Sequence, residues 1–135
     1  MIPTQQTILH DPDNGLHGNC FAATLASLLH LPIEEIPSFT NPHSWKNDLN
    51  HWLRQYHLAY IEIANFPEVC EDYSIKDCYC EVSGVTPRSP KVLHATVGID
   101  GKSIYDPHPT QVGLTGPTTT GIFIALQPWL LTHLR

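Results

Sequence analysis

The first half of the chain carries its apolar residues at helical spacing. Small and apolar side chains predominate from residue 20 to about residue 30, where Leu31-Pro32 ends the run, and residues 32–37 resemble one short helical turn. A second helix is expected over residues 42–57. Its apolar stripe follows the positions i, i+4, i+7, i+8 and i+11, occupied by Trp45, Leu49, Trp52, Leu53 and Tyr56.

From about residue 58 the pattern changes to short strands punctuated by Pro and Gly. Strands are expected at residues 58–63, 78–85, 92–99, 102–105 and 121–126. Residues 65–77 show weak periodicity, and residues 106–120 are rich in Pro, Gly and Thr, so both segments are expected to be loops. Helices followed by consecutive strands predict an α+β domain with a largely antiparallel sheet.

Composition narrows the class of protein. A chain of 135 residues that is 41% hydrophobic fits one domain spanning residues 1–135. No apolar stretch approaches the roughly 20 residues of a membrane span, and the first residues lack a basic leader, so we expect a cytoplasmic protein without a membrane partner. The formal charge of −6 and the lack of a basic cluster argue against nucleic acid as a partner. In a reducing compartment the four cysteines are expected to be free.

The candidate chemistry begins with Cys20, which follows Gly18-Asn19 and opens the first helix. Unpaired backbone N–H groups and the helix dipole stabilise a thiolate there, which predicts a lowered pKa and a nucleophile. His94 and Asp106 follow on two neighbouring short strands. A cysteine, a histidine and an aspartate in this order are typical of cysteine hydrolases.

The turn between the last two of these residues decides whether they meet. A two-residue turn at Asp100-Gly101 places Asp106 opposite Ala95, on the other face of the sheet from His94. A three-residue loop with a bulge instead places Asp106 directly opposite His94. The chemistry requires the second register, and the hydrophobic pattern alone permits both.

Three segments resemble those of papain-like cysteine peptidases, and especially the small bacteriocin-processing branch. They are Gly18-Asn19-Cys20-Phe21-Ala22-Ala23, His94-Ala95-Thr96-Val97-Gly98 and Ile104-Tyr105-Asp106-Pro107-His108-Pro109, within a match over about residues 10–110. The resemblance implies a central helix that opens with the nucleophile and packs on a sheet carrying the other two residues. It assigns Cys20 as nucleophile, His94 as acid and base, and Asp106 as the group that orients the imidazole.

This family usually supplies an oxyanion-hole Gln a few residues before the nucleophile. Here Asn14 stands six residues before Cys20 and Asn19 immediately before it, and either amide can pair with the Cys20 backbone N–H. The spacing favours Asn14. Substrate contacts are expected from His17 in the cleft, from Arg88 toward a carboxylate or phosphate, and from His108 near the mouth of the site.

The predicted activity is acyl transfer through a thioester acyl-enzyme, acting on a peptide or small amide and needing no cofactor or metal. Two alternatives stay open. One is a catalytically inactive papain-like module that binds a peptide or small ligand. The other is a zinc-stabilised domain, for which Cys70, Cys78 and Cys80 or a group of His10, His17 and Cys20 are candidate ligands, although the one-residue spacing of Cys78 and Cys80 is not that of a zinc knuckle.

Overall fold

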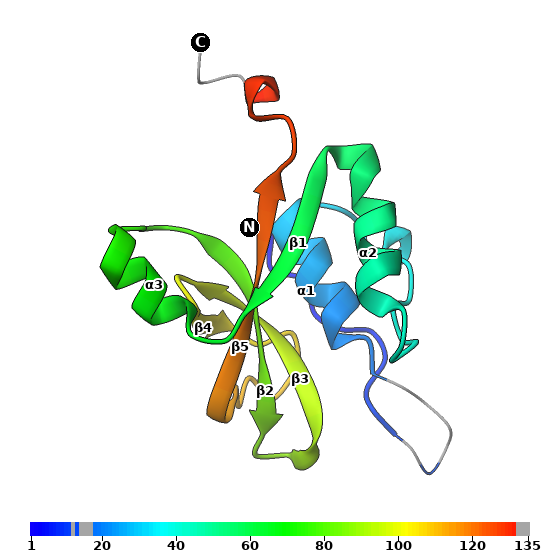
Figure 1. Cartoon of the computed structure of the whole chain (residues 1–135). Coiled ribbons are helices and arrows are strands. Elements are labelled where there is room, and N and C mark those ends of the chain that lie inside the picture. Colours follow the sequence, from blue (N-terminus) through cyan, green and yellow to red (C-terminus); the bar gives the residue numbers. More distant parts are fainter. Residues whose placement is uncertain (12, 14–17, 132–135) are drawn as a thin grey trace.

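The computed structural model describes residues 1–11, 13 and 18–131 of the chain (Figure 1). The α-helices in these residues are α1 (Cys20–Leu29), α2 (Trp45–Leu53) and α3 (Phe66–Tyr73). The strands are β1 (Leu58–Ile63), β2 (Tyr79–Thr86), β3 (Ser89–Ile99), β4 (Lys102–Tyr105) and β5 (Thr115–Ala125). Short 3-10 turns lie at Ile33–Glu35, Arg54–Tyr56 and Pro128–Leu130.

The strands form one sheet in the order β1-β5-β2-β3-β4, and every neighbouring pair is antiparallel. Helix α1 packs on β3 and β2, and α2 packs on β1. Figure 1 shows these two helices together on one side of the sheet, with α3 well away from them. The expected α+β class with an antiparallel sheet is therefore confirmed.

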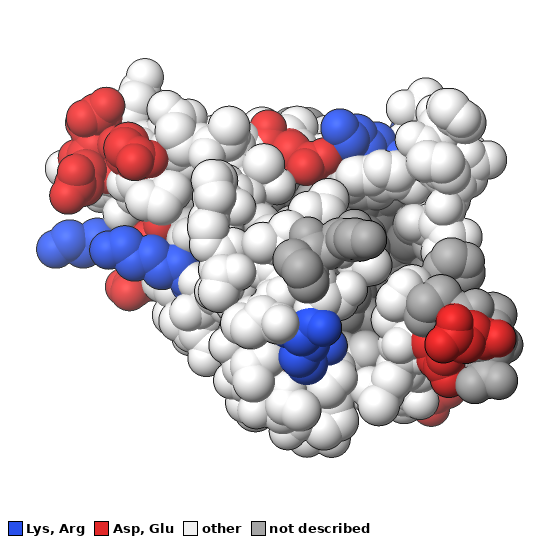
Figure 2. Space-filling model, turned by 90° about the horizontal axis from the view of Figure 1, so that it is seen from below, with Lys and Arg blue, Asp and Glu red and all other residues white. Residues whose placement is uncertain are grey.

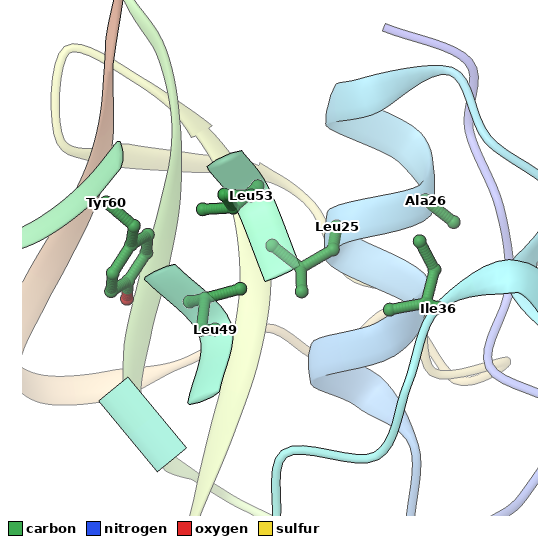
Figure 3. Close-up of a cluster of buried hydrophobic side chains, with 6 residues drawn as sticks. All are labelled: Leu25, Ala26, Ile36, Leu49, Leu53 and Tyr60. Carbon is green, nitrogen blue, oxygen red and sulfur yellow. The ribbon is translucent and has the colours of Figure 1, made fainter. Parts of the chain in front are cut away.

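A cluster of buried apolar side chains joins α1, α2 and β1 (Figure 3). Its members are Leu25, Ala26, Ile36, Leu49, Leu53 and Tyr60. Burying each of the leucines contributes about 1.5–3 kcal/mol relative to leaving it exposed. Because this cluster holds α1 against its neighbours, it also determines where the first residue of that helix lies relative to the sheet.

The loop expected at residues 65–77 is wrong, because helix α3 occupies most of it. Pro67 stands in the first turn, where its missing N–H costs nothing, and Ser74 ends the helix in the left-handed conformation. Only Phe66 and Cys70, one turn apart, are buried. A helix of 8 residues with two buried positions is too short for its periodicity to be recognised.

The loop expected at residues 106–120 is also partly wrong, because β5 begins at Thr115. Its first half, Thr115 to Thr119, is mostly exposed and contains Gly116 and Pro117, which are typical of turns. This half pairs with β2 across a register shift between Ser83 and Val85. The irregular pairing between the first half of β5 and the last residues of β2 thus explains why this part of the strand is not evident from composition.

The face seen in Figure 2 is mostly uncharged, with basic and acidic residues in small separate groups. Among the described residues, no helix has both the length and the apolar character required to cross a bilayer.

Candidate active site

Cys20 is the first residue of α1 and faces strand β3. The backbone N–H of Ala95 donates to its Sγ at 3.5 Å, although the two residues are 75 positions apart in the chain. The side chain is half-buried. The predicted helix start is therefore confirmed, and the thiol lies beside the residue that follows His94.

His94 and Asp106 form a buried pair. His94 Nε2 lies 2.6 Å from Asp106 Oδ1, and the two residues are 6% and 4% exposed. An ionised carboxylate only accepts hydrogen bonds, so Nε2 is the donor and Nδ1 of a neutral imidazole carries no proton. The pairing that the sequence predicted is present in the structure.

The register that brings this pair together differs from the one required above. The loop is the two-residue turn Asp100-Gly101, both with positive φ (55° and 84°), and Ile99 pairs with Lys102. The expected three-residue loop, with Asp106 directly opposite His94, is therefore wrong.

A bulge on β4 restores the common face. Gly98 pairs with Ser103, but Val97 pairs with Tyr105, which leaves Ile104 as the extra residue. One further step along this register places Asp106 opposite Thr96, a residue on the same face as His94. The bulge therefore does what the longer loop was expected to do.

Asp106 is surrounded by hydrogen-bond donors. Besides the His94 ring, the backbone N–H of His108 donates to Oδ1 at 2.8 Å and that of Gly113 donates to Oδ2 at 2.8 Å. Burial alone raises the pKa of the Asp106 carboxyl, but these three hydrogen bonds together lower it below its ordinary value. Asp106 is thus ionised at neutral pH, as the orientation of an imidazole requires.

The pKa of the Cys20 thiol is raised, not lowered as predicted. Burial is the main cause, and the negative charges of Glu81 and Asp106 add to it. Hydrogen bonds from the backbone N–H groups of Ala95 and Phe21 act in the opposite direction without balancing these effects. The prediction was wrong because it counted the helix N-terminus but neither the burial of the thiol nor the carboxylates that fold toward it.

Two cavities meet at the pair Cys20 and His94. The smaller has a volume of about 70 Å³, and Gln6, His10 and Arg88 are among the residues that line it. The larger, of about 230 Å³, extends between the helices and the sheet. Cys20, His94 and Leu93 line both cavities, so the thiol has open space on either side.

The expected oxyanion residues need revision. Asn14 lies outside the described residues. The Asn19 side-chain oxygen Oδ1 accepts the backbone N–H of Thr7 and of Ile8 at 3.0 and 2.8 Å, and its side-chain amide Nδ2 donates to Thr7 Oγ1 at 2.8 Å. The expected oxyanion role of Asn19 is therefore not supported, because this side chain holds the N-terminal segment in place and is not among the residues that line the two cavities beside Cys20.

Gln6 is the residue that the sequence analysis missed. It is 8% exposed and lines the smaller cavity with Cys20 and His94. Its backbone N–H donates to Pro107 O at 3.0 Å, and its amide Nε2 gives one hydrogen to Ile8 O at 3.0 Å, which leaves the other available. The sequence does contain a glutamine ahead of Cys20, as this family usually does. Because Gln6 stands fourteen positions before Cys20, no local motif reveals it.

The remaining candidates differ in position. His17 lies outside the described residues. Arg88 is exposed at the smaller cavity. The His108 ring packs edge-on against the His94 ring with centroids 6.3 Å apart, and burial followed by the charge of Arg88 lowers its pKa. Arg88 thus shares a cavity with Cys20 and His94, and His108 contacts the His94 ring, while their predicted contacts with a substrate stay predictions.

The four cysteines are unbonded. Burial raises the pKa of Cys70 and Cys78, and raises that of Cys80 to about 12. Within the described residues, no group of three or more His, Cys, Asp or Glu side chains is arranged to hold a metal ion. Of the ligands considered for zinc, His17 falls outside this part of the chain.

Comparisons with protein-family models, with curated proteins and with solved structures find no significant match to this chain.

Proposed function

We propose that the chain is a cysteine-dependent hydrolase of papain-like arrangement that acts on a peptide or a small amide. The observation that carries the proposal is that His94, which is buried and paired with Asp106, lines the same two cavities as Cys20 at the start of α1. A histidine that only fills a core needs neither an ionised partner nor a neighbouring thiol in a cavity.

In the first step Cys20 Sγ attacks the substrate carbonyl carbon. Its proton passes to His94 Nδ1, because Nε2 is already committed to Asp106. Since burial raises the pKa of the thiol, the proton leaves sulfur during the attack, and His94 acts as a general base. Asp106 then stabilises the imidazolium, which protonates the leaving amine. Water assisted by His94 hydrolyses the resulting thioester.

The negative oxygen of the tetrahedral intermediate is bound by the backbone N–H of Cys20 and by the free amide hydrogen of Gln6. A donor of this kind contributes about 3 kcal/mol to transition-state binding. The two cavities on either side of the thiol accommodate the acyl portion and the leaving portion of one substrate.

The test is acylation by p-nitrophenyl acetate, which requires no knowledge of the natural substrate. We expect a burst of nitrophenolate equal to the amount of protein and the mass of one acetyl group on Cys20, located by peptide mapping. Cys20→Ala abolishes the burst, and His94→Ala slows it by at least about 100-fold. Acetylation of Cys20 no faster than that of half-buried Cys78 would refute the proposal.

One observation favours a non-catalytic binding module. The raised pKa of Cys20 describes a thiol of low reactivity in the absence of a base. The same experiment separates the two functions, since in a binding module His94→Ala leaves the acetylation rate unchanged.

A further inference from the structure

The larger cavity beside Cys20 contains a buried carboxylate that the proposed chemistry does not use. Glu81, on β2, is 2% exposed and lines this cavity. The Tyr60 hydroxyl donates to its Oε1 at 2.6 Å, and the Ser83 hydroxyl donates to its Oε2. Each oxygen thus has one donor and retains acceptor capacity.

No cationic side chain pairs with this carboxylate in the part of the chain that the structure describes. The other acidic residue of the cavity, Glu62, is already paired, because Lys46 Nζ lies 2.9 Å from its Oε1. Among the described residues, Glu81 is therefore the acidic side chain of the cavity that has no cationic partner, and it carries an uncompensated negative charge whenever it is ionised. Buried charges in proteins are normally paired, so such a group requires an explanation.

The cavity walls are aromatic. Phe21, Phe39, Trp45 and Tyr60 line it, and the rings of Phe21, Trp45 and Tyr60 pack edge-on with centroids 5.7 to 6.2 Å apart. Aromatic faces attract cations, and the chain already shows this at Trp45, where Lys46 Nζ lies 5.5 Å from the ring centroid. A cavity lined by aromatic side chains and by a buried carboxylate is suited to an aliphatic chain that ends in a positive charge.

We propose that this cavity is a binding subsite for a cationic side chain of the substrate, of the lysine or arginine type, with Glu81 as its counter-ion. The inference rests on the proposed function for the identity of the substrate, but binding of the cation does not require hydrolysis. The aliphatic portion packs against Trp45 and Phe21, and the ammonium or guanidinium group reaches the carboxylate that Tyr60 and Ser83 hold in place. The scissile carbonyl then lies over Cys20.

The experiment compares labelling of Cys20 by thiosulfonates of similar size and different charge. Aminoethyl methanethiosulfonate is the cationic probe and propyl methanethiosulfonate the neutral one. In each reaction the Cys20 thiolate attacks the sulfenyl sulfur, a mixed disulfide forms and methanesulfinate leaves. The ratio of the two rate constants cancels the reactivity of the thiol itself. Mildly alkaline pH keeps Glu81 ionised, since burial raises its pKa to about 7.

We expect the cationic probe to be favoured at Cys20 by about tenfold more than at Cys78, which serves as an internal reference. Glu81→Gln, which keeps the shape and an acceptor for Tyr60, removes this preference. The matched control is Glu68→Gln, which changes the net charge equally at an exposed position on α3. It preserves the preference for the cationic probe. An equal ratio in wild type and Glu81→Gln overturns the inference.

A second measurement needs no variant. Butylammonium slows the alkylation of wild-type Cys20 by iodoacetamide more than its neutral counterpart butanol does. Equal protection by the two overturns the inference. Cation-selective labelling in a protein that fails the acetylation test supports the subsite and refutes the hydrolase, so the two proposals fail separately.

Discussion

The Asp106→Asn substitution tests both the stability and the chemistry of the site. Three donors converge on the carboxylate: His94 Nε2 and the His108 N–H on Oδ1, and the Gly113 N–H on Oδ2. An amide has one acceptor oxygen. If the amide oxygen points toward His94, the amide NH₂ group faces the Gly113 N–H, and two donors meet. If the amide is turned the other way, its NH₂ group faces the donor on the His94 ring.

The magnitude follows from these contacts. One buried N–H left without an acceptor costs about 1–3 kcal/mol, and the hydrogen bonds that remain lose their charge assistance. We expect a loss of about 2.5 kcal/mol in the free energy of unfolding at neutral pH. For a chain of 135 residues this corresponds to a decrease in Tm of about 9 °C. The rate of acetylation falls by roughly 100-fold, because the imidazolium loses its counter-ion.

The dependence on pH has a definite sign. Since the folded-state pKa of Asp106 is lowered, its contribution is present above the ordinary carboxyl value and is lost as pH falls toward the folded-state pKa. Urea denaturation of wild type and of Asp106→Asn, at neutral pH and again below about pH 4, measures this contribution to the free energy of unfolding. The gap between wild type and variant narrows on acidification.

The matched control is Asp100→Asn. Asp100 lies on the same hairpin and accepts the Cys78 N–H at 2.9 Å and the exposed Asp77 N–H at 3.3 Å, whereas the His94 ring is bonded to Asp106. We expect less than about 1 kcal/mol of destabilisation and an unchanged acetylation rate. Equal losses in the two variants, or a gap for Asp106→Asn that stays constant in acid, would refute the reasoning.

Three further outcomes are expected. Glu81→Gln flattens the pH dependence of stability, because the pKa of Glu81 is raised to about 7 in the folded state. The free energy of unfolding of wild type therefore falls by about 3 kcal/mol as pH rises from the pKa of Glu81 in the unfolded chain to its pKa in the folded state. Urea denaturation at both ends of this pH range shows whether the variant loses stability in the same way. Gln6→Ala lowers the acetylation rate by about 100-fold with little change in Tm, if its amide binds the oxyanion. Gly98→Ala destabilises by about 1–3 kcal/mol, measured by urea denaturation, because a Cβ there would lie 2.5 Å from Val82 Cγ2 and 2.8 Å from the Lys102 carbonyl oxygen.

Local patterns predicted the elements that depend on local physics. The helix at Cys20–Leu29 and the strands at Leu58–Ile63 and Lys102–Tyr105 match the expected ranges closely. In each of these the apolar positions agree with the element, and Gly or Pro residues flank the helix and the strand at Lys102–Tyr105.

The errors arose where distant parts of the chain decide. The pKa of Cys20 depends on burial by the assembled fold and on Glu81, which no helix-start rule includes. Gln6 reaches the site through a backbone hydrogen bond to Pro107 O. The bulge on β4 has no signature in the hydrophobic pattern, because both faces of that hairpin carry apolar residues.

The same bulge bears on how much the length of this hairpin can vary. Ile104 is the residue that the ladder does not pair, and it is 50% exposed. A chain without it would run straight from the Gly98–Ser103 pair to the Val97–Tyr105 pair and still present the aspartate on the face of His94. Two hairpins that differ by one residue are therefore compatible with the same histidine–aspartate pair. A gap in this region of a sequence alignment thus does not by itself signify that the pair is lost.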